Sequence, residues 1–151
     1  MLVVCKTNIS QCDPLVLPHN PQYAMSESNY VVASGWYSVD GNFSGYCLTV
    51  GAEYQIYGIL LYGDQKRYLV VDDDSMPGFL PTELFQICNS TLFFDWKICE
   101  YTIETQALLF IGYPELCESY SNLIGLIDWQ PQHIERFLSY KEYLLSNIEQ
   151  F

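Results

Sequence analysis

Three consecutive aspartates, Asp72, Asp73 and Asp74, are the residues of this sequence with the clearest potential for chemistry. They follow an apolar run and precede a segment with proline and glycine, in the stretch YLVVDDDSMPGFLP over residues 68–81. Carboxylates grouped in this way can ligate a metal ion, catalyse a reaction by acid–base chemistry, or offer negative charge to a basic partner. The rest of the sequence discriminates among these three uses.

A calcium-binding loop of the EF-hand type is the most specific metal site that this stretch could encode. Glu83 stands at the right distance from Asp72 to close such a loop, but the sixth position, where glycine is needed, is occupied by Pro77, next to Met76. On a strand, neighbouring side chains point to opposite faces, so only Asp72 and Asp74 converge. Two carboxylates hold a hydrated Mg²⁺ only weakly, and we therefore expect no metal site and no cofactor.

The motifs of the common enzyme classes are missing from the sequence. It contains no G-x-G-x-x-G, P-loop, G-x-S-x-G or H-E-x-x-H pattern. We interpret His133 as a solvent-facing or locally bonded residue in the first turn of a helix, and the six cysteines form no C-x-x-C pair. We therefore expect no catalytic residues and no enzyme. A metal-dependent hydrolase that uses the triple aspartate (residues 72–74) is an alternative.

The charge balance favours the third use, recognition of a basic partner. Eighteen acidic and six basic side chains give the 151 residues a formal net charge of −12 at pH 7. Such a surface repels phosphate backbones and anionic lipid, so we expect neither a nucleic-acid nor a membrane partner. It attracts a cation or a basic protein, although acidity that only keeps an aromatic-rich chain soluble is an equal alternative.

The strand and helix signals predict an α+β fold, namely an antiparallel sheet or partly closed barrel with an amphipathic C-terminal helix packed on it. Residues 1–29 are predicted to form an irregular arm, and residues 30–151 a single domain. A hairpin with its turn over residues 63–66 places the triple aspartate at the far end of its second strand. MPGFLP, residues 76–81, is predicted to be a loop.

The final helix is predicted from an apolar stripe at helical spacing, with Asp128 as its cap and Pro131 in its first turn. No apolar run approaches the roughly 18–20 residues needed to cross a bilayer. The apolar run at the start is shorter than that of a secretory signal. We therefore expect a soluble, cytoplasmic protein.

Aromatic residues are abundant next to the acids, and they suit a binding face. The chain has 13 tyrosines and 3 tryptophans; most of them, including Trp36, Trp96 and Trp129, are expected in the core. Tyrosines beside carboxylates suit the capture of a surface rich in lysine and arginine. The predicted partner-binding residues are Asp72, Asp73, Asp74, Glu83 and Asp64, with Tyr62 and Tyr68 as anchors.

Residues 48–89 carry a resemblance to a known group of proteins. They follow the pattern LT-x-G-x-x-Y-x-(V/I)-Y-G-(I/V), then a strand into DDD, a proline-containing loop, and LF before another strand. Trp96 and the FIGYPE of residues 110–115 fit the same pattern. In this respect the chain resembles the small bacterial immunity proteins of polymorphic-toxin and contact-dependent growth inhibition systems.

The resemblance implies a cytoplasmic protein that binds and neutralises one cognate toxin domain, often a basic nuclease. It carries over no site residues, and it does not cover residues 1–29. Together with the acidic charge it makes an immunity or inhibitor protein our leading hypothesis. A small-molecule or peptide-binding module is the third possibility that the sequence leaves open, beside the hydrolase.

Overall fold

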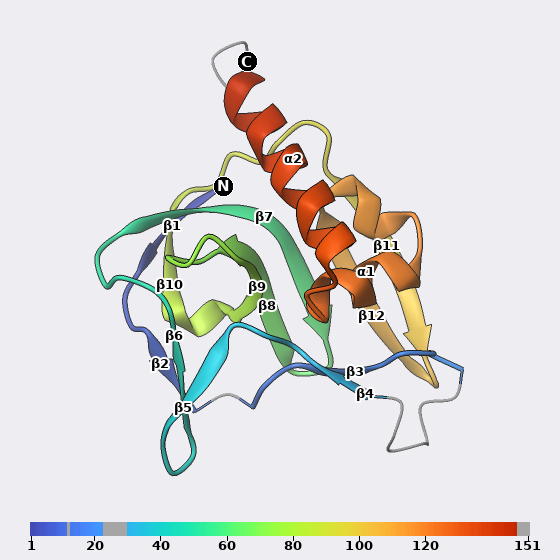
Figure 1. Cartoon of the computed structure of the whole chain (residues 1–151), viewed down its shortest axis with the longest axis horizontal. Helices are drawn as coiled ribbons and strands as arrows, with labels where there is room; N and C mark the ends of the chain where they lie inside the picture. Colours follow the sequence, from blue (N-terminus) through green and yellow to red (C-terminus); the bar gives the residue numbers. More distant parts are fainter. Residues whose placement is uncertain (12, 23–29, 148–151) are drawn as a thin grey trace.

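The computed structural model describes residues 1–11, 13–22 and 30–147. In chain order, its elements are β1 (Leu2–Cys5), β2 (Ile9–Ser10), β3 (Val16–Pro18), β4 (Tyr30–Val32), β5 (Trp36–Asp40), β6 (Phe43–Tyr46), β7 (Glu53–Tyr62), β8 (Gln65–Val71), β9 (Pro77–Pro81), η2 (Thr82–Leu84), β10 (Phe85–Asn89), β11 (Lys97–Ile103), β12 (Gln106–Gly112), η3 (Pro114–Cys117), α1 (Tyr120–Ile127) and α2 (Pro131–Asn147) (Figure 1).

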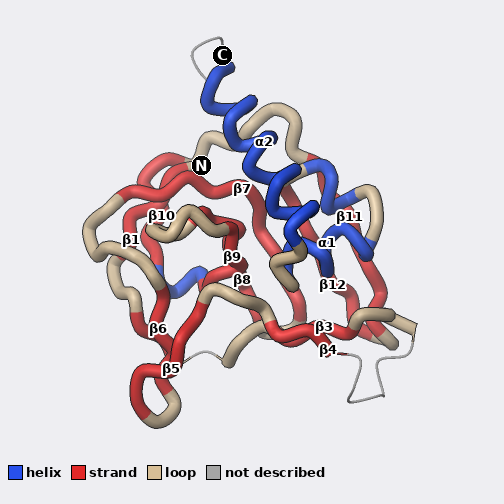
Figure 2. Tube along the Cα trace, viewed as in Figure 1, coloured by secondary structure: helices blue, strands red, loops and turns tan. Residues whose placement is uncertain are grey.

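The main sheet is antiparallel and has β7 at its centre. Its strand order is β10-β1-β7-β12-β11, and β8 and β9 extend it from β7. A small sheet, β2-β6-β5, and the pair β3-β4 lie beside it (Figure 2). The helices come last in the chain, and α2 crosses over the sheet (Figure 1). The predicted α+β class with a C-terminal helix is therefore confirmed.

The predicted hairpin is formed by β7 and β8. Tyr62 pairs with Gln65 across a turn of two residues, Gly63 and Asp64, so the turn is tighter than the four residues predicted. Gly63 has a φ of +61°, which glycine adopts at little cost. β8 ends at Val71, and the triple aspartate follows it directly, as the sequence predicts.

The prediction of a loop over residues 76–81 is wrong, because Pro77–Pro81 forms β9. β9 pairs with β8 in register from Val71↔Pro77 to Arg67↔Pro81. Among the described strands β8 is its only partner, so β9 is an edge strand. Proline is tolerated at such an edge and at strand ends, because no ladder bond to its missing N–H is required there.

The N-terminal residues also differ from the prediction of an irregular arm. β1 lies between β10 and β7 in the main sheet, and Leu15 and Leu17 are buried in the core. The fully buried Arg67 donates a hydrogen bond to the backbone carbonyl of Asp13 and another to that of Phe79, so it fastens this segment to β8 and β9. Residue 12 and residues 23–29, the rest of the predicted arm, lie outside the described residues.

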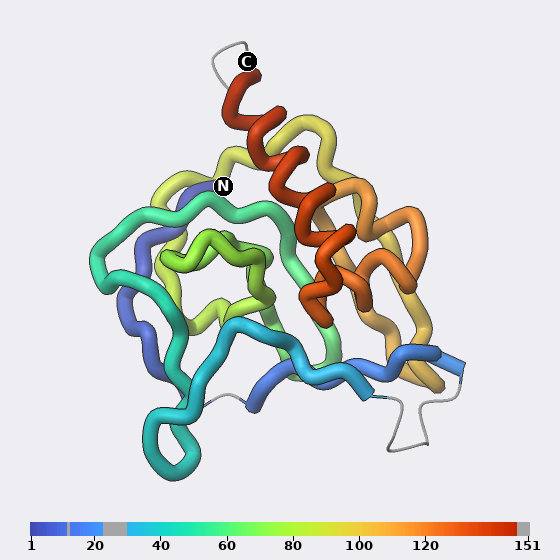
Figure 3. Tube along the Cα trace, viewed as in Figure 1, coloured from blue at the N-terminus to red at the C-terminus, as the bar shows by residue number. Residues whose placement is uncertain are grey.

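The buried hydrophobic residues form two separate cores. The larger one packs α1, α2, β3 and β4 against the sheet around Phe110 and Phe137. The smaller one is enclosed by β1, β8, β9 and β10 around Ile56 and Leu84. Figure 3 shows the strands of the smaller core curling around it, although the described strands close no barrel.

The C-terminal helices differ from the prediction at their junction. α2 begins at Pro131, whereas Asp128 ends α1, its backbone N–H donating to the carbonyl of Ile124. Gly125 lies inside α1 and does not break it, and the ring of His133 packs where a side chain at this position would stand. Phe137 and Leu144 form the buried stripe of α2, and the predicted stripe residue at position 148 lies outside the described residues.

We expect Gly112→Ala to unfold the protein far more readily than a glycine substitution at an open position. A Cβ at Gly112 would stand 2.4 Å from the Cα of Gly58 and 2.5 Å from the carbonyl oxygen of Tyr57, both backbone atoms of β7. The expected loss is about 3 kcal/mol of unfolding free energy, measured by urea denaturation.

The matched control is Gly41→Ala. Gly41 has a φ of +54° but no heavy atom within 4 Å of the added Cβ. Its expected loss is about 1 kcal/mol, from the backbone conformation alone. Equal losses for the two variants would contradict the close approach of β7 and β12.

Candidate functional site

Asp72, the first residue of the triple aspartate, supports the loop in which it lies. Its Oδ1 accepts hydrogen bonds from the backbone N–H groups of Asp74 and Met76, at 2.9 and 3.0 Å. Its own N–H donates to the carbonyl of Met76, and the N–H of Ser75 donates to the carbonyl of Asp72. The residue is only 8% exposed. It therefore fixes the loop between β8 and β9, instead of offering an open carboxylate to a partner.

Asp73 connects the same loop to the segment before β7. Its two carboxylate oxygens accept hydrogen bonds from the hydroxyls of Tyr54 and Thr49, both at 2.7 Å. Its backbone N–H donates to the carbonyl of Cys47, at 2.9 Å. Asp73 thus joins two segments that are far apart in sequence, and most of its hydrogen-bonding capacity is used inside the protein.

Asp74, like Asp73, is exposed to solvent, but it also lines the cavity described below. Its carboxylate accepts a hydrogen bond from the Cys47 thiol, and this bond is the largest cause of the raised pKa of that thiol. Burial and the charges of the three aspartates raise the thiol pKa further. The field around Cys47 is therefore negative, and the thiol stays protonated.

Asp72 and Asp74 line an open cavity of about 490 Å³ between the triple aspartate, the start of β5 and Trp129, the second residue after α1. Its other walls include Trp36, Tyr37 and Trp129. We call it the acidic aromatic cavity. Burial raises the pKa of the Asp72 carboxyl, and the charges of the two neighbouring aspartates act in the same direction, against the two backbone N–H groups that lower it. A bound cation would relieve this repulsion.

Two of the three aromatic walls are held in place by contacts with other segments. Trp129 follows α1 with a φ of +55°, and its indole N–H donates to the carbonyl of Pro77, at 2.6 Å. Tyr37 pairs with Gly45 across the β5–β6 hairpin, and its ring occupies the space where a side chain at Gly45 would stand. Trp36 and Tyr37 remain 38% and 53% exposed. Both Trp36 and Trp129 were expected in the core, and both instead face this cavity.

The remaining residues of the predicted binding face lie elsewhere. Asp64 is exposed in the β7–β8 turn, at the opposite end of the seven-residue β8, roughly 23 Å away at about 3.3 Å per residue. Glu83 lies in η2, beyond the end of β9 that pairs with Arg67, and accepts a hydrogen bond from the Ser10 hydroxyl. The predicted acids therefore occupy two ends of β8 and do not form one surface.

The two predicted anchor tyrosines are half-buried. Tyr62 packs against the larger core, and Tyr68 packs against the smaller one, with its ring centroid 6.0 Å from that of Phe85. Neither residue lines the acidic aromatic cavity. The aromatic side chains beside the acids are instead those of Trp36, Tyr37 and Trp129, which come from segments far from the triple aspartate in sequence.

The chemistry of the cavity suits recognition of a cation. Carboxylates and aromatic faces both attract ammonium and guanidinium groups. Nucleophilic catalysis by Cys47 would need a lowered thiol pKa, and its surroundings do the opposite. Within the described residues, no three or more histidine, cysteine, aspartate or glutamate side chains gather so that they could hold a metal ion.

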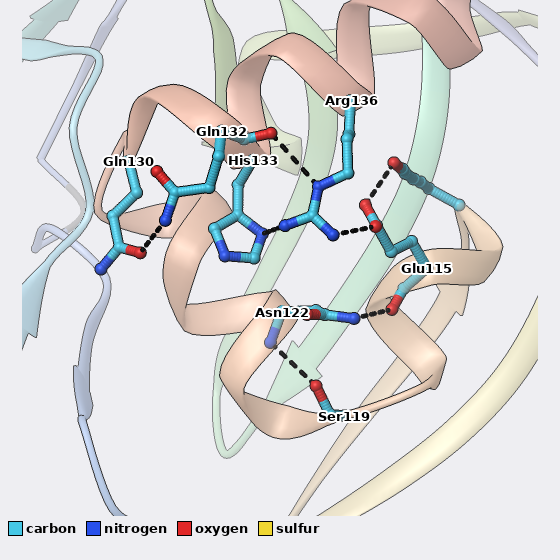
Figure 4. A network of polar contacts seen from close by, with 8 residues as sticks. Glu115, Ser119, Asn122, Gln130, Gln132, His133 and Arg136 are labelled. Carbon is cyan, nitrogen blue, oxygen red and sulfur yellow. Dashed lines mark hydrogen bonds and ion pairs between the residues drawn. The ribbon is translucent and has the colours of Figure 1, made fainter.

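A second polar cluster surrounds His133 at the start of α2 (Figure 4). The Arg136 guanidinium lies 2.8 Å from the Glu115 carboxylate and donates to Nδ1 of His133, at 3.4 Å. The Tyr113 hydroxyl donates to the other Glu115 oxygen, at 2.6 Å. His133 is buried against Gly125, so it is not the solvent-facing residue of our first alternative, and its bond with Arg136, three residues away, is the local hydrogen bond of the second. The cluster fastens α2 to η3.

Comparisons with known proteins add no relative. No family model matches the chain, no curated protein matches it, and no solved structure matches its fold. In the part of the chain that the structure describes, no helix is both long enough and apolar enough to cross a membrane.

We expect Asp72→Ala to destabilise the protein by about 1–3 kcal/mol, because two partly buried N–H groups lose their acceptor. Asp72→Asn keeps an oxygen acceptor and removes a charge that burial disfavours, so its stability should stay within about 0.5 kcal/mol of the wild type. Urea denaturation measures both variants. Equal losses in the two would show that the Asp72 oxygen does not hold the loop.

The stability of the wild type should fall more steeply on acidification than that of His133→Gln. Burial, followed by the Arg136 charge, lowers the pKa of His133 below its ordinary value of 6.5. The unfolded chain therefore takes up a proton that the folded chain resists, and stability is lost as the pH falls through 6.5. Urea denaturation at pH 7.5 and 5.5 measures the difference; parallel pH dependences would contradict a buried, neutral His133.

Proposed function

We propose that this chain is an inhibitor that binds a basic protein domain and accepts one of its cationic side chains in the acidic aromatic cavity. The observation that carries the proposal is the cavity itself, where Asp74 stands beside Trp36, Tyr37 and Trp129. A guanidinium group can stack on an aromatic ring while its N–H groups bind a carboxylate. An arginine of the partner matches both features of this cavity.

The dimensions and charge of the surroundings support the same function. A cavity of about 490 Å³ falls in the range of roughly 300–1,000 Å³ typical of ligand sites. The formal net charge of −12 steers a basic partner toward the protein and speeds the encounter. Trp36 and Tyr37 are large aromatic side chains at the rim, the residue type that contributes most to protein interfaces.

The resemblance of residues 48–89 to bacterial immunity proteins suggests which partner is bound and what the binding achieves. In this form the partner is a cognate toxin domain, basic and nuclease-like, and the chain neutralises it in the cytoplasm. The inhibitor acts by binding and needs no catalytic group. A cationic small molecule would use the same cavity, so a small-molecule-binding module is the second candidate function.

The cavity is tested with N-acetyl-L-arginine amide, using the citrulline analogue as an uncharged isostere. We expect the arginine compound to shift the indole N–H signals of Trp36 and Trp129 in NMR titrations, and the citrulline compound to leave them in place. Asp74→Asn should weaken arginine binding about fivefold, because it removes the charge of the exposed carboxylate. Asp64→Asn is the matched control: it removes the same charge at the far end of β8 and should leave the affinity unchanged.

Equal weakening by the two variants would mean that the overall charge alone attracts the ligand, which contradicts the cavity as a site. Inhibition itself is tested by growth. The protein encoded by the neighbouring gene is expressed in a bacterial host with this chain or with its Asp74→Asn variant. Growth arrest that the wild type relieves and the variant relieves less supports the inhibitor. Arrest that neither relieves counts against that pairing.

A further inference from the structure

We infer that β5 is the docking edge for an extended basic segment of the partner, which adds to the β2-β6-β5 sheet as a further strand. The inference rests on the proposed function and names how the partner is held. β5 pairs with β6 on one side and, among the described residues, with no strand on the other. An edge of this kind offers a row of N–H and C=O groups to an incoming chain.

The side chains of β5 are unusually open for a sheet strand. All five residues of Trp36–Asp40 are exposed. The exposed large apolar residues of β5 and the adjoining β6 are Trp36, Tyr37, Val39 and Phe43, of which the last two are 45% and 42% exposed. The β5–β6 hairpin projects from the body of the molecule (Figure 1). Apolar side chains on a projecting hairpin are what an added strand would cover.

β5 lacks lysine and proline, two of the usual protections against strand addition, and its one irregularity is a register shift with β6 between Ser38 and Asp40. Proteins guard exposed edges with lysine, proline or an inward-pointing charge. The sequence of β5, WYSVD, has neither lysine nor proline. By contrast, among the edge strands of the main sheet, β11 begins with Lys97, β9 begins and ends with proline, and β10 has no acidic residue. β5 thus combines negative charge with an edge that has neither lysine nor proline.

Charge decides what occupies this edge. Asp40 ends β5, and the acidic aromatic cavity with Asp72 and Asp74 adjoins its first residue. A second copy of the chain would bring like charges to both ends, which opposes self-pairing. An extended segment with an arginine or lysine at its ends would meet carboxylates at both. The occupant that fits is therefore a basic segment of a protein partner.

The length of the edge sets the length of the segment. Five strand residues span roughly 17 Å at about 3.3 Å per residue, so about five partner residues can pair with β5. Alternate side chains of a strand share a face, so the first, third and fifth partner residues point the same way. A basic residue at the end next to Trp36 then enters the cavity, while apolar residues between the ends cover Tyr37 or Val39.

The probe for the test is the peptide Ac-Arg-Val-Thr-Val-Arg-NH2, which places an arginine near the cavity in either strand direction. Two N-methylated forms are compared with it, one methylated at residues 2 and 4, the other at residues 3 and 5. Alternate N–H groups of a strand point to opposite edges, and only one edge pairs with β5. We expect one methylated form to bind at least about tenfold more weakly and the other to lose less than about threefold, as measured by calorimetry.

Amide hydrogen exchange gives an independent readout on the protein. Binding of the unmethylated peptide should slow exchange at alternate amides of β5 and leave the edge strand β10 unchanged. Equal affinity of all three peptides, or no binding of the unmethylated one, would overturn strand addition. So would a stable dimer of the chain alone whose β5 amides are protected, because the edge would then belong to a second copy.

The outcomes separate this inference from the proposed function. Arginine amide that binds in the cavity, together with peptides insensitive to methylation, would leave the cation site standing and remove the docking edge. A methylation effect that Asp74→Asn does not reduce would keep the docking edge and remove the cavity. Both results in the expected direction place the end of the partner's segment in the cavity.

Discussion

The constraint on which the structure depends is that one strand, β7, serves two hydrophobic cores. Its first residues pair with β1 around the smaller core, and its residues from Gly58 onward pair with β12 under the larger one. The register with β8 shifts between Ile56 and Gly58, where the strand changes course. Gly58 and Gly112 make this possible, because any side chain at Gly112 would meet the backbone of β7. The course of β7 also sets the course of β8, and with it the position at which the triple aspartate leaves the sheet.

The three aspartates show how position, and not residue type, assigns a role. Asp72 is buried and accepts hydrogen bonds from the backbone of its own loop. Asp73 accepts hydrogen bonds from the hydroxyls of residues 49 and 54. Asp74 lies beside Cys47 at the cavity. The structural roles of the first two make the third available: the loop that they fix holds Asp74 next to the aromatic walls. A carboxylate on an unsupported loop would lose affinity to the entropy of ordering it.

Local signals in the sequence were sufficient for the hairpin, the position of the triple aspartate and the final helix, since each depends on neighbours in the chain. Predictions from the sequence were wrong where the place of a residue depends on partners far away in the chain. Pro77 and Pro81 read as loop residues, although an edge position accommodates them in β9. Trp36 and Trp129 read as core residues from their type alone. Only the fold, which brings the start of β5 and the end of α1 to the aspartates, reveals their place in the cavity. The Asp-Gly turn at residues 40–41, which indicates the β5–β6 hairpin, was the one sequence signal that could have pointed to the cavity.

Net charge and local geometry make separate contributions to recognition, and the distinction bears on what the acidic surface can achieve. A formal charge of −12 spread over the molecule accelerates the approach of any basic protein, and screening by salt weakens that effect beyond about 8–10 Å. It cannot by itself choose one partner. Selection requires short-range features that a wrong partner fails to satisfy. Under the proposed function, a cavity that requires a cation at one point, joined to a strand edge that requires an extended chain in one register, would supply two such requirements a fixed distance apart. A basic surface that meets only one of these requirements would be attracted to the protein but would not form a stable complex.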